Sequence, residues 1–233
     1  MLELDPAYEL ERARGWIARV EKLTGVTLAG EMVLFSALTL MDGYARFEHG
    51  THRVFLGVDE NHGRGKYLDV LISHELTHVA RESQESVWAG WGVHPRDLDH
   101  DGFVQHQTVV EHLMNEGLAC AVSELLNPGL APHLYAYQSE DSLLHVLEHA
   151  PGLDREIHAE LRKGAQGTYR SLYDPARYAA DMPRFAHYVW AWRWARTVLA
   201  QHCGGDVARL TRLCSKDLVE NALAFQLARD GDG

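Results

Sequence analysis

Apolar residues recur at helical spacing near the start of the chain and then change to a strand-like pattern. Residues three and four apart fall on one face of a predicted amphipathic helix over residues 6–23, namely Leu10, Ala13, Ile17, Val20 and Leu23. From residue 25 to residue 59, β-branched and aromatic residues stand in short runs, GVTLAGEMVLFSAL and YARFEHGTHRVFLGVD. This first quarter of the chain therefore predicts one helix followed by a small mixed sheet of three or four strands.

The rest of the chain is mainly helical in pattern. Helical periodicity returns over residues 66–83, whereas residues 85–101 carry glycines, a proline and clustered aspartates, which predict a long loop. A second long helix is expected from about residue 103 to residue 126, and a terminal helix pair over residues 207–227. We expect an α+β fold in one domain over residues 1–233, with a sheet-bearing lobe at about 1–84 and a helical lobe at about 102–233.

Charge and composition exclude several classes of protein. The 233 residues include 22 Lys and Arg against 33 Asp and Glu, a net charge of −11, which would repel nucleic acid and anionic membranes. The apolar runs are shorter than the roughly 18–20 residues that cross a bilayer. The charged N-terminus lacks the apolar core of a secretion signal, and the three cysteines form no CxxC pair. We therefore expect a cytoplasmic protein with no nucleic acid or membrane partner.

The predicted helix over residues 66–83 contains the sequence His74-Glu75-Leu76-Thr77-His78, which reads H-E-x-x-H. Histidines four residues apart lie one turn apart on the same face, so both imidazoles can reach one metal ion. Glu75 is rotated away from them, where its carboxylate can deprotonate a metal-bound water. With 15 histidines in the chain, a chance match is the alternative interpretation.

A catalytic zinc usually takes three protein ligands, so a third ligand is required. The best candidate is Glu116 on the next long helix, where the small residues Gly117 and Ala119 would allow the two helices to approach closely. His112, one turn earlier on the same face, is the competing ligand; alternatively, with Asn115, it orients the ligands.

The sequence offers two other possible sets of zinc ligands. The longer metzincin motif fails, because Arg81 and Gln84 stand where its glycine and third histidine would be. Cys120, one turn after Glu116, would close the site as a fourth ligand and make it purely structural. Burial of Cys120 as a small apolar thiol is the simpler interpretation.

HELTH followed by NEGLA resembles the gluzincin zinc metallopeptidases, in which a glutamate of the second helix is the third zinc ligand. The chain looks most similar to uncharacterised bacterial proteins predicted to be zinc-dependent proteases, over about residues 51–199. In those proteins a proline and a tyrosine-bearing helix follow the glutamate helix, and here that stretch is MPRFAHYVW over residues 182–190. The resemblance implies a zincin-like fold with zinc as the cofactor.

The resemblance also implies two further features of the site. Tyr188, or His187, would donate a hydrogen bond to the oxyanion that forms at the substrate carbonyl. The alternative is that Tyr188 belongs to the buried stripe of a core helix. The strand over residues 52–58 would be the edge strand that pairs with the substrate backbone.

Two more patterns invite interpretation. The acidic loop from Asp97 to Val104 matches the first eight positions of an EF-hand calcium loop, but Thr108 stands where the closing glutamate belongs, so a helix cap or solvated loop is favoured. Three tryptophans at alternate positions, Trp190, Trp192 and Trp194, cannot share one helix face. We expect at least one of them near the surface or at a contact.

These patterns together predict a zinc metallopeptidase that hydrolyses peptide bonds in a peptide or protein substrate. His74, His78 and Glu116 hold the zinc, Glu75 is the general base, and Tyr188 is the candidate oxyanion donor. The alternatives are a regulatory or sensor protein that binds a partner with little turnover, and a structural zinc site. The sequence leaves the substrate and the oligomeric state open.

Overall fold

The fold was analysed in a computed structural model, which describes residues 5–36, 43–48, 51–58, 66–164, 169–174 and 182–227. The N-terminal part contains α1 (Pro6–Thr24), β1 (Gly30–Ser36), β2 (Gly43–Glu48), β3 (Thr51–Val58) and α2 (Lys66–Glu82). It is followed by α3 (Glu85–Ala89), η1 (Pro95–Asp97), α4 (His100–His106), α5 (Val109–Leu126), α6 (Pro132–Tyr135), α7 (Glu140–Glu148) and α8 (Ala150–Leu161). The last elements are η3 (Tyr169–Tyr173), α9 (Ala186–Gln201), α10 (Val207–Arg212), η5 (Ser215–Leu218) and α11 (Val219–Ala224). The mixed α+β class and the small mixed sheet are confirmed.

The sheet has the strand order β1-β3-β2, so β3, the last of the three strands in the sequence, lies in the middle. β1 pairs with β3 in parallel, with Val33 opposite Phe55, and β2 pairs with β3 antiparallel, with Tyr44 opposite Phe55. The prediction that residues 52–58 form an edge strand is wrong, because β1 and β2 occupy both sides of β3. Among the described strands, β1 and β2 are the two edges of the sheet, and β2 contacts both α2 and α4.

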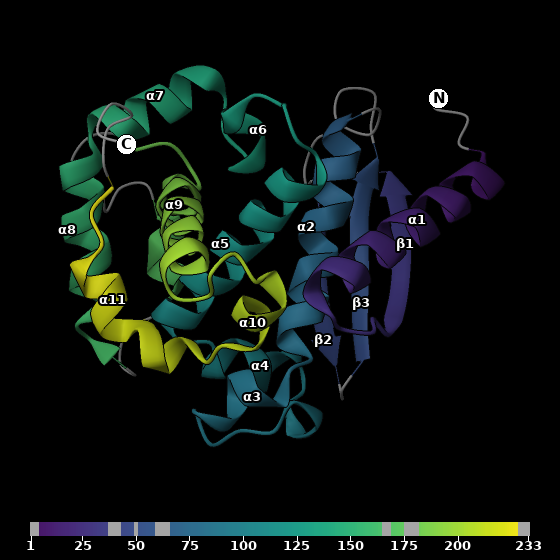
Figure 1. The fold of residues 1–233 in the computed structure, drawn as a ribbon, viewed down its shortest axis with the longest axis horizontal. Helices are drawn as coiled ribbons and strands as arrows, with labels where there is room; N and C mark the ends of the chain where they lie inside the picture. The colour runs from purple at the N-terminus through teal and green to yellow at the C-terminus, as the bar shows by residue number, and fades with distance from the viewer. Residues whose placement is uncertain are drawn as a thin grey trace.

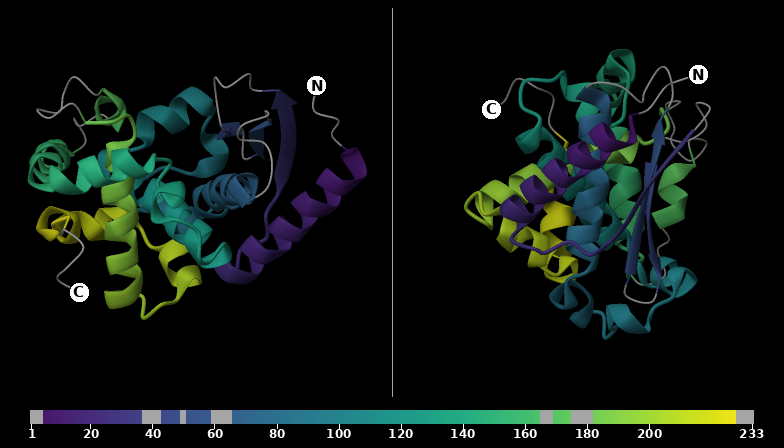
Figure 2. Two further views of the ribbon diagram at one scale, coloured as in Figure 1. Left: turned by 90° about the horizontal axis from the view of Figure 1, so that it is seen from above. Right: turned by 90° about the vertical axis from the view of Figure 1, so that its right-hand side faces the viewer.

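One face of the sheet is covered by helices. Val54 and Leu56 of β3 are buried in a cluster with Trp16 of α1 and Leu68 of α2, whereas the side chains between them in sequence point to the other face. Figure 1 shows α1 crossing this face and α2 running beside the sheet, and Figure 2 shows the same layering from above. This packing fixes α2 against the strands.

Helix α2 stands between the sheet and the helical part of the molecule. Every residue of α2 from Leu68 to Glu82 is buried except Asp69, including the polar ones. The burial is nearly complete because α1 and the sheet cover one side of the helix and α5 covers the other. α5 in turn packs against α9, which lies in the middle of the helices α6 to α8, α10 and α11 (Figure 1). Two of the most buried helices, α2 and α5, therefore meet near the centre of the fold.

The three tryptophans of α9 correct the prediction that one would lie near the surface. Trp190, Trp192 and Trp194 are all buried, because α5, α7, α8 and α10 all pack against α9. Each indole N–H donates to an oxygen of another element, Asp154, Glu124 and Asn221 respectively, at 2.7–2.9 Å. Satisfied N–H groups allow a helix to bury aromatic residues on more than one face.

Two boundaries also differ from the prediction. Residues 85–101 contain the short helices α3 and η1 rather than a plain loop. The predicted helix over residues 103–126 is two helices, because the Thr108 hydroxyl accepts a hydrogen bond from the Glu111 N–H and caps the start of α5. No helix among the described residues is long and apolar enough to cross a membrane.

Gly117 has a different role from the one predicted. A Cβ atom at position 117 would lie 2.2 Å from the carbonyl oxygen of Ala191, so the missing side chain allows α5 and α9 to touch. The sequence analysis expected Gly117 to bring α5 close to α2. The glycine instead faces the opposite neighbour, and Glu116 beside it faces α2.

Candidate metal centre

Helices α2 and α5 bring His74, His78 and Glu116 together. Oε2 of Glu116 lies 3.2 Å from Nε2 of His74 and 3.5 Å from Nε2 of His78. One ligand atom from each residue lies within 4.8 Å of the others, and the three side chains are buried. The three predicted ligands thus form a group that could hold a metal ion.

The charges of this group are strongly coupled. Burial opposes the charge on Glu116, but neighbouring His78, aided by hydrogen bonds from both histidines, lowers the pKa of Glu116 well below 4.5. Burial also lowers the pKa of His74 to about 4. For His78 the effect of burial is outweighed by the Glu116 carboxylate, which raises the pKa to about 10. In the metal-free group Glu116 thus favours the protonated form of His78, and a bound metal ion would take the place of that proton.

The structure places Glu116 in the ligand group and the competing ligand His112 outside it. Nδ1 of His112 lies 3.9 Å from Oε1 of Glu116, the oxygen that does not face His74, so His112 stands behind the group. Burial lowers the pKa of His112 to about 4. His112 is therefore a neutral neighbour of the carboxylate, and its ring packs on Tyr169 with centroids 4.6 Å apart.

Cys120 is also outside the ligand group. Its Sγ lies 4.0 Å from Nδ1 of His74, on the opposite side of the ring from Nε2. Burial raises the pKa of the Cys120 thiol well above 9, so it keeps its proton. Cys120 cannot close the group as a fourth ligand from this position.

A cleft of about 610 Å³ opens beside the ligand group. Glu75 lines it together with His74 and His78, as the H-E-x-x-H spacing predicts. Gly43 of β2 forms the opposite wall: a Cβ at this position would lie 3.3 Å from Oε1 of Glu75 and 3.1 Å from Leu71. Glycine at position 43 thus lets the edge strand lie directly against the candidate general base.

Tyr188 and His187 occupy different places. Tyr188 lines the cleft with its ring stacked at 17° to His74, but its hydroxyl is 3.1 Å from the hydroxyl of Tyr173. His187 is fully buried behind the cleft and packs against Tyr173. Burial lowers the pKa of His187 to about 3, so it is neutral. Of these two predicted donors, only Tyr188 borders the cleft, and its hydroxyl already has a partner.

A second tyrosine of the cleft, Tyr137, was missed by the sequence analysis. It lies between α6 and α7, and its ring meets His74 edge-on with centroids 4.8 Å apart. Its φ is +54°, a left-handed conformation that costs about 1–3 kcal/mol. The neighbouring Gln138 holds it there by donating hydrogen bonds to His133 and Arg184 carbonyls at 3.0 Å.

The hydroxyl of Tyr137 is the unusual feature. It is buried and has no hydrogen-bond partner among the described residues. Burial raises the pKa of Tyr137 well above 10, so the group stays a proton donor. No spacing in the sequence signals this residue, because its placement depends on an unfavourable backbone angle.

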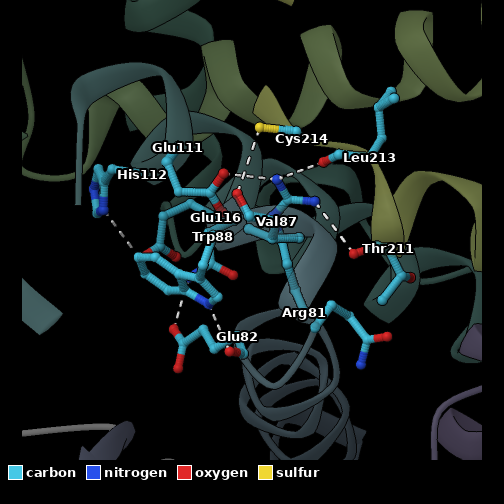
Figure 3. A network of polar contacts seen from close by, with 12 residues as sticks. Arg81, Glu82, Val87, Trp88, Glu111, His112, Glu116, Thr211, Leu213 and Cys214 are labelled. Carbon is cyan, nitrogen blue, oxygen red and sulfur yellow. Dashed lines mark hydrogen bonds and ion pairs between the residues drawn. The ribbon is translucent and has the colours of Figure 1, made fainter. Parts of the chain in front are cut away.

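A second buried charge group joins the same two helices next to the ligands. Arg81 of α2 donates from Nε and Nη2 to the two carboxylate oxygens of Glu111 of α5, both at 2.7 Å. Its remaining donors reach the carbonyls of Leu210, Thr211 and Leu213 (Figure 3). Arg81, one turn after His78 on α2, thus fixes the distance between α2 and α5. It occupies the sequence position at which the metzincin motif has a glycine.

The acidic loop is a helix cap. Oδ1 of Asp99 accepts from the N–H of Gly102 at 2.7 Å and begins α4. Among the described residues, His74, His78 and Glu116 are the only group of three or more His, Cys, Asp or Glu ligands close enough for a metal. The cap accounts for Asp99, the third position of the EF-hand match.

Comparison of the chain with models of known protein families, with curated proteins and with solved structures gave no match. The site must therefore be interpreted from its own geometry.

Proposed function

We propose that the protein is a zinc-dependent metallopeptidase, with zinc held by His74, His78 and Glu116. The observation that carries the proposal is a single carboxylate oxygen, Oε2 of Glu116, within 3.5 Å of both histidine Nε2 atoms. It lies beside a cleft that Glu75 also lines. This is the ligand set of a catalytic zinc, which leaves a position for water.

The two distances between the Glu116 oxygen and the histidine nitrogens agree with those expected for zinc. Zinc binds histidine and carboxylate at about 2.0–2.2 Å in a tetrahedron, which separates the ligand atoms by about 3.3–3.5 Å. The distances from Oε2 of Glu116 to the histidines are 3.2 and 3.5 Å. A calcium or magnesium site would instead be built from oxygen ligands.

The residues of the cleft supply the remaining chemistry. Bound zinc would polarise the substrate carbonyl and lower the pKa of a water molecule. The Glu75 carboxylate takes a proton from the attacking water and delivers it to the leaving nitrogen. A phenol that keeps its proton donates to the oxygen that becomes negative. Tyr137 suits this role better than Tyr188, because its hydroxyl has no other partner among the described residues.

The edge strand gives the cleft a means of holding an extended chain. β2 is antiparallel to β3 and borders the cleft through Gly43, Tyr44 and Ala45. An extended peptide can add to such an edge by main-chain hydrogen bonds. A sheet edge beside an H-E-x-x-H helix, with a glutamate ligand on a second helix, is the arrangement that the resemblance to gluzincins leads one to expect. We therefore propose a zincin-like fold.

Metal content and hydrolysis together test the proposal. We expect the purified protein to hold one zinc per chain by elemental mass spectrometry and to cleave members of a peptide library. Glu75→Gln should keep the zinc and lower hydrolysis by about 10²–10⁴-fold, because it removes the general base. The control Glu85→Gln makes the same change on an exposed residue of α3 and should leave both unchanged.

The outcomes separate the proposed function from its alternatives. Zinc bound without hydrolysis of any peptide would favour a regulatory protein that binds a partner. No zinc after metal reconstitution would overturn the proposal, and H-E-x-x-H would then be a chance match.

A further inference from the structure

We propose that the cleft contains a subsite for a primary ammonium group of the substrate, formed by Glu82, Asn115 and His112. The inference rests on the proposed peptidase function and specifies its substrate class. All three residues are buried and all three line the cleft. Figure 3 shows Glu82, His112 and Glu116 close to the Arg81–Glu111 pair.

Glu82 is held in place with room to accept more hydrogen bonds. Oε1 of Glu82 accepts from Nδ2 of Asn115 at 2.8 Å, and Oε2 lies 3.1 Å from Nε2 of His52. A carboxylate accepts about four hydrogen bonds, so each oxygen can take another. The carboxylate is thus oriented by the protein but not saturated by the bonds described.

Two further acceptors beside Glu82 have no partner. Asn115 must direct its Nδ2 toward the carboxylate, which leaves Oδ1 as an acceptor, and that atom is buried without a hydrogen bond. Nε2 of His112 is likewise buried and unpaired among the described residues. Nδ1 of His112 lies 3.9 Å from the Glu116 carboxylate, and the tautomer that carries its proton on Nδ1 leaves Nε2 as an acceptor. Buried polar atoms are rarely left unsatisfied, so a group in the cleft is expected to pair with them.

These acceptors match one kind of ligand. A primary ammonium carries a positive charge and three donors, and it meets here one carboxylate and two neutral acceptors. An anion would find no donor in this set and would be repelled by Glu82. A second metal ion is not favoured, because the described residues hold only one close group of metal-type ligands.

The position of the subsite fits an amine near the bond that is cut. Glu82 follows His78 by one helical turn, a rise of about 6 Å along α2. That span separates a carbonyl at the metal group from the side-chain amine of a lysine on the same residue or from an α-amino group on the adjoining residue, since an α-amino group lies only about 3 Å from its own carbonyl. The ammonium is therefore either the free α-amino group of a peptide or the side-chain amine of a lysine.

Binding of three hydroxamates to the zinc-loaded protein distinguishes these two sources without measuring turnover. Glycyl-leucine hydroxamate offers an α-ammonium on the adjoining residue, Nα-acetyl-lysine hydroxamate offers a side-chain ammonium, and N-acetyl-leucine hydroxamate offers neither. We expect calorimetry to show one of the first two binding about 10- to 100-fold tighter than the third, the range for a charged hydrogen bond. The tighter compound identifies the source of the amine.

Variants of the subsite should remove this preference alone. Glu82→Gln should bind N-acetyl-leucine hydroxamate as the unaltered protein does, which shows that it folds and holds zinc, but lose the preference for the ammonium. Asn115→Ala, which keeps the carboxylate, should lose part of it. Glu85→Gln, an exposed carboxylate outside the cleft, should keep it in full.

Two results would overturn the inference, and they differ. If zinc is bound and all three hydroxamates bind equally, the subsite does not exist although the metal site does. If no zinc is retained and none of the compounds binds, the proposed function fails and the substrate class fails with it.

Discussion

Two buried charge groups join α2 to α5 about one helical turn apart, and they differ in how completely the protein satisfies them. In the Arg81–Glu111 pair every carboxylate oxygen and guanidinium nitrogen has a protein partner at 2.7–3.4 Å. In the His74–His78–Glu116 group one carboxylate lies between two histidines and faces a cleft of about 610 Å³. The first group is closed and the second is open.

The difference separates a group that only joins the two helices from a group that can still accept a ligand. A buried ion pair that does not line the cleft is out of reach of a ligand, and removing one member leaves the other charged and unpaired. The open group is surrounded instead by polar atoms without partners, among them the Tyr137 hydroxyl and Oδ1 of Asn115. The closed pair holds two helices at the spacing that the open group requires.

The largest expected effect comes from breaking the closed pair. Arg81→Ala should lower the free energy of unfolding by about 3–5 kcal/mol, because Glu111 and three carbonyl groups lose their donor in the interior. Urea denaturation of the metal-free protein measures this loss.

An exposed pair provides the matched control. Arg53 contacts Glu31 at 2.8 Å on the surface of the sheet, with the side chains 51% and 61% exposed. Arg53→Ala should cost less than about 1 kcal/mol, because water replaces the lost contact. Equal losses in the two variants would contradict the structural role assigned to Arg81.

The next effect concerns the two tyrosines of the open group. Tyr137→Phe should lower kcat by about 10²–10³-fold with zinc content unchanged, because it removes a hydroxyl at the cleft that has no other partner among the described residues. Tyr188→Phe should lower kcat by less than about 10-fold, since the Tyr188 hydroxyl is already paired with Tyr173. A larger loss for Tyr188→Phe would return the role to the residue that the sequence resemblance indicates.

The sequence predicted the parts of the site that depend on local spacing. His74 and His78 meet because they are four residues apart on a helix, and the helix itself follows from its apolar pattern. Glu116 was found by asking which acidic residue lies on the next long helix beside small residues. The reason given was wrong in part, because Gly117 faces α9 and not α2.

Features that depend on tertiary structure were missed. Strand order is not encoded in the pattern of a single strand, so β3 was placed at the edge instead of the centre. Arg81 was noted only as a departure from the metzincin motif, although its partners in α10 and beyond lie some 130 residues away. Tyr137 has a backbone angle that no composition rule would assign to a tyrosine.

The smallest expected effect comes from altering the open group in the absence of metal. Glu116→Gln should lower the free energy of unfolding of the metal-free protein by about 1.5–3 kcal/mol, less than Arg81→Ala, because hydrogen bonds to a charged group are lost but His78 can release its proton once the carboxylate is gone. Zinc at 1,000 times its Kd should stabilise the unaltered protein by about 4 kcal/mol and leave the variant unchanged. Denaturation of both proteins with zinc and with a chelator measures the two effects. If Glu116→Gln lowers the free energy of unfolding of the metal-free protein as much as Arg81→Ala does, Glu116 has a structural role. A residue whose role is to bind metal contributes most of its stabilisation only after the metal has bound.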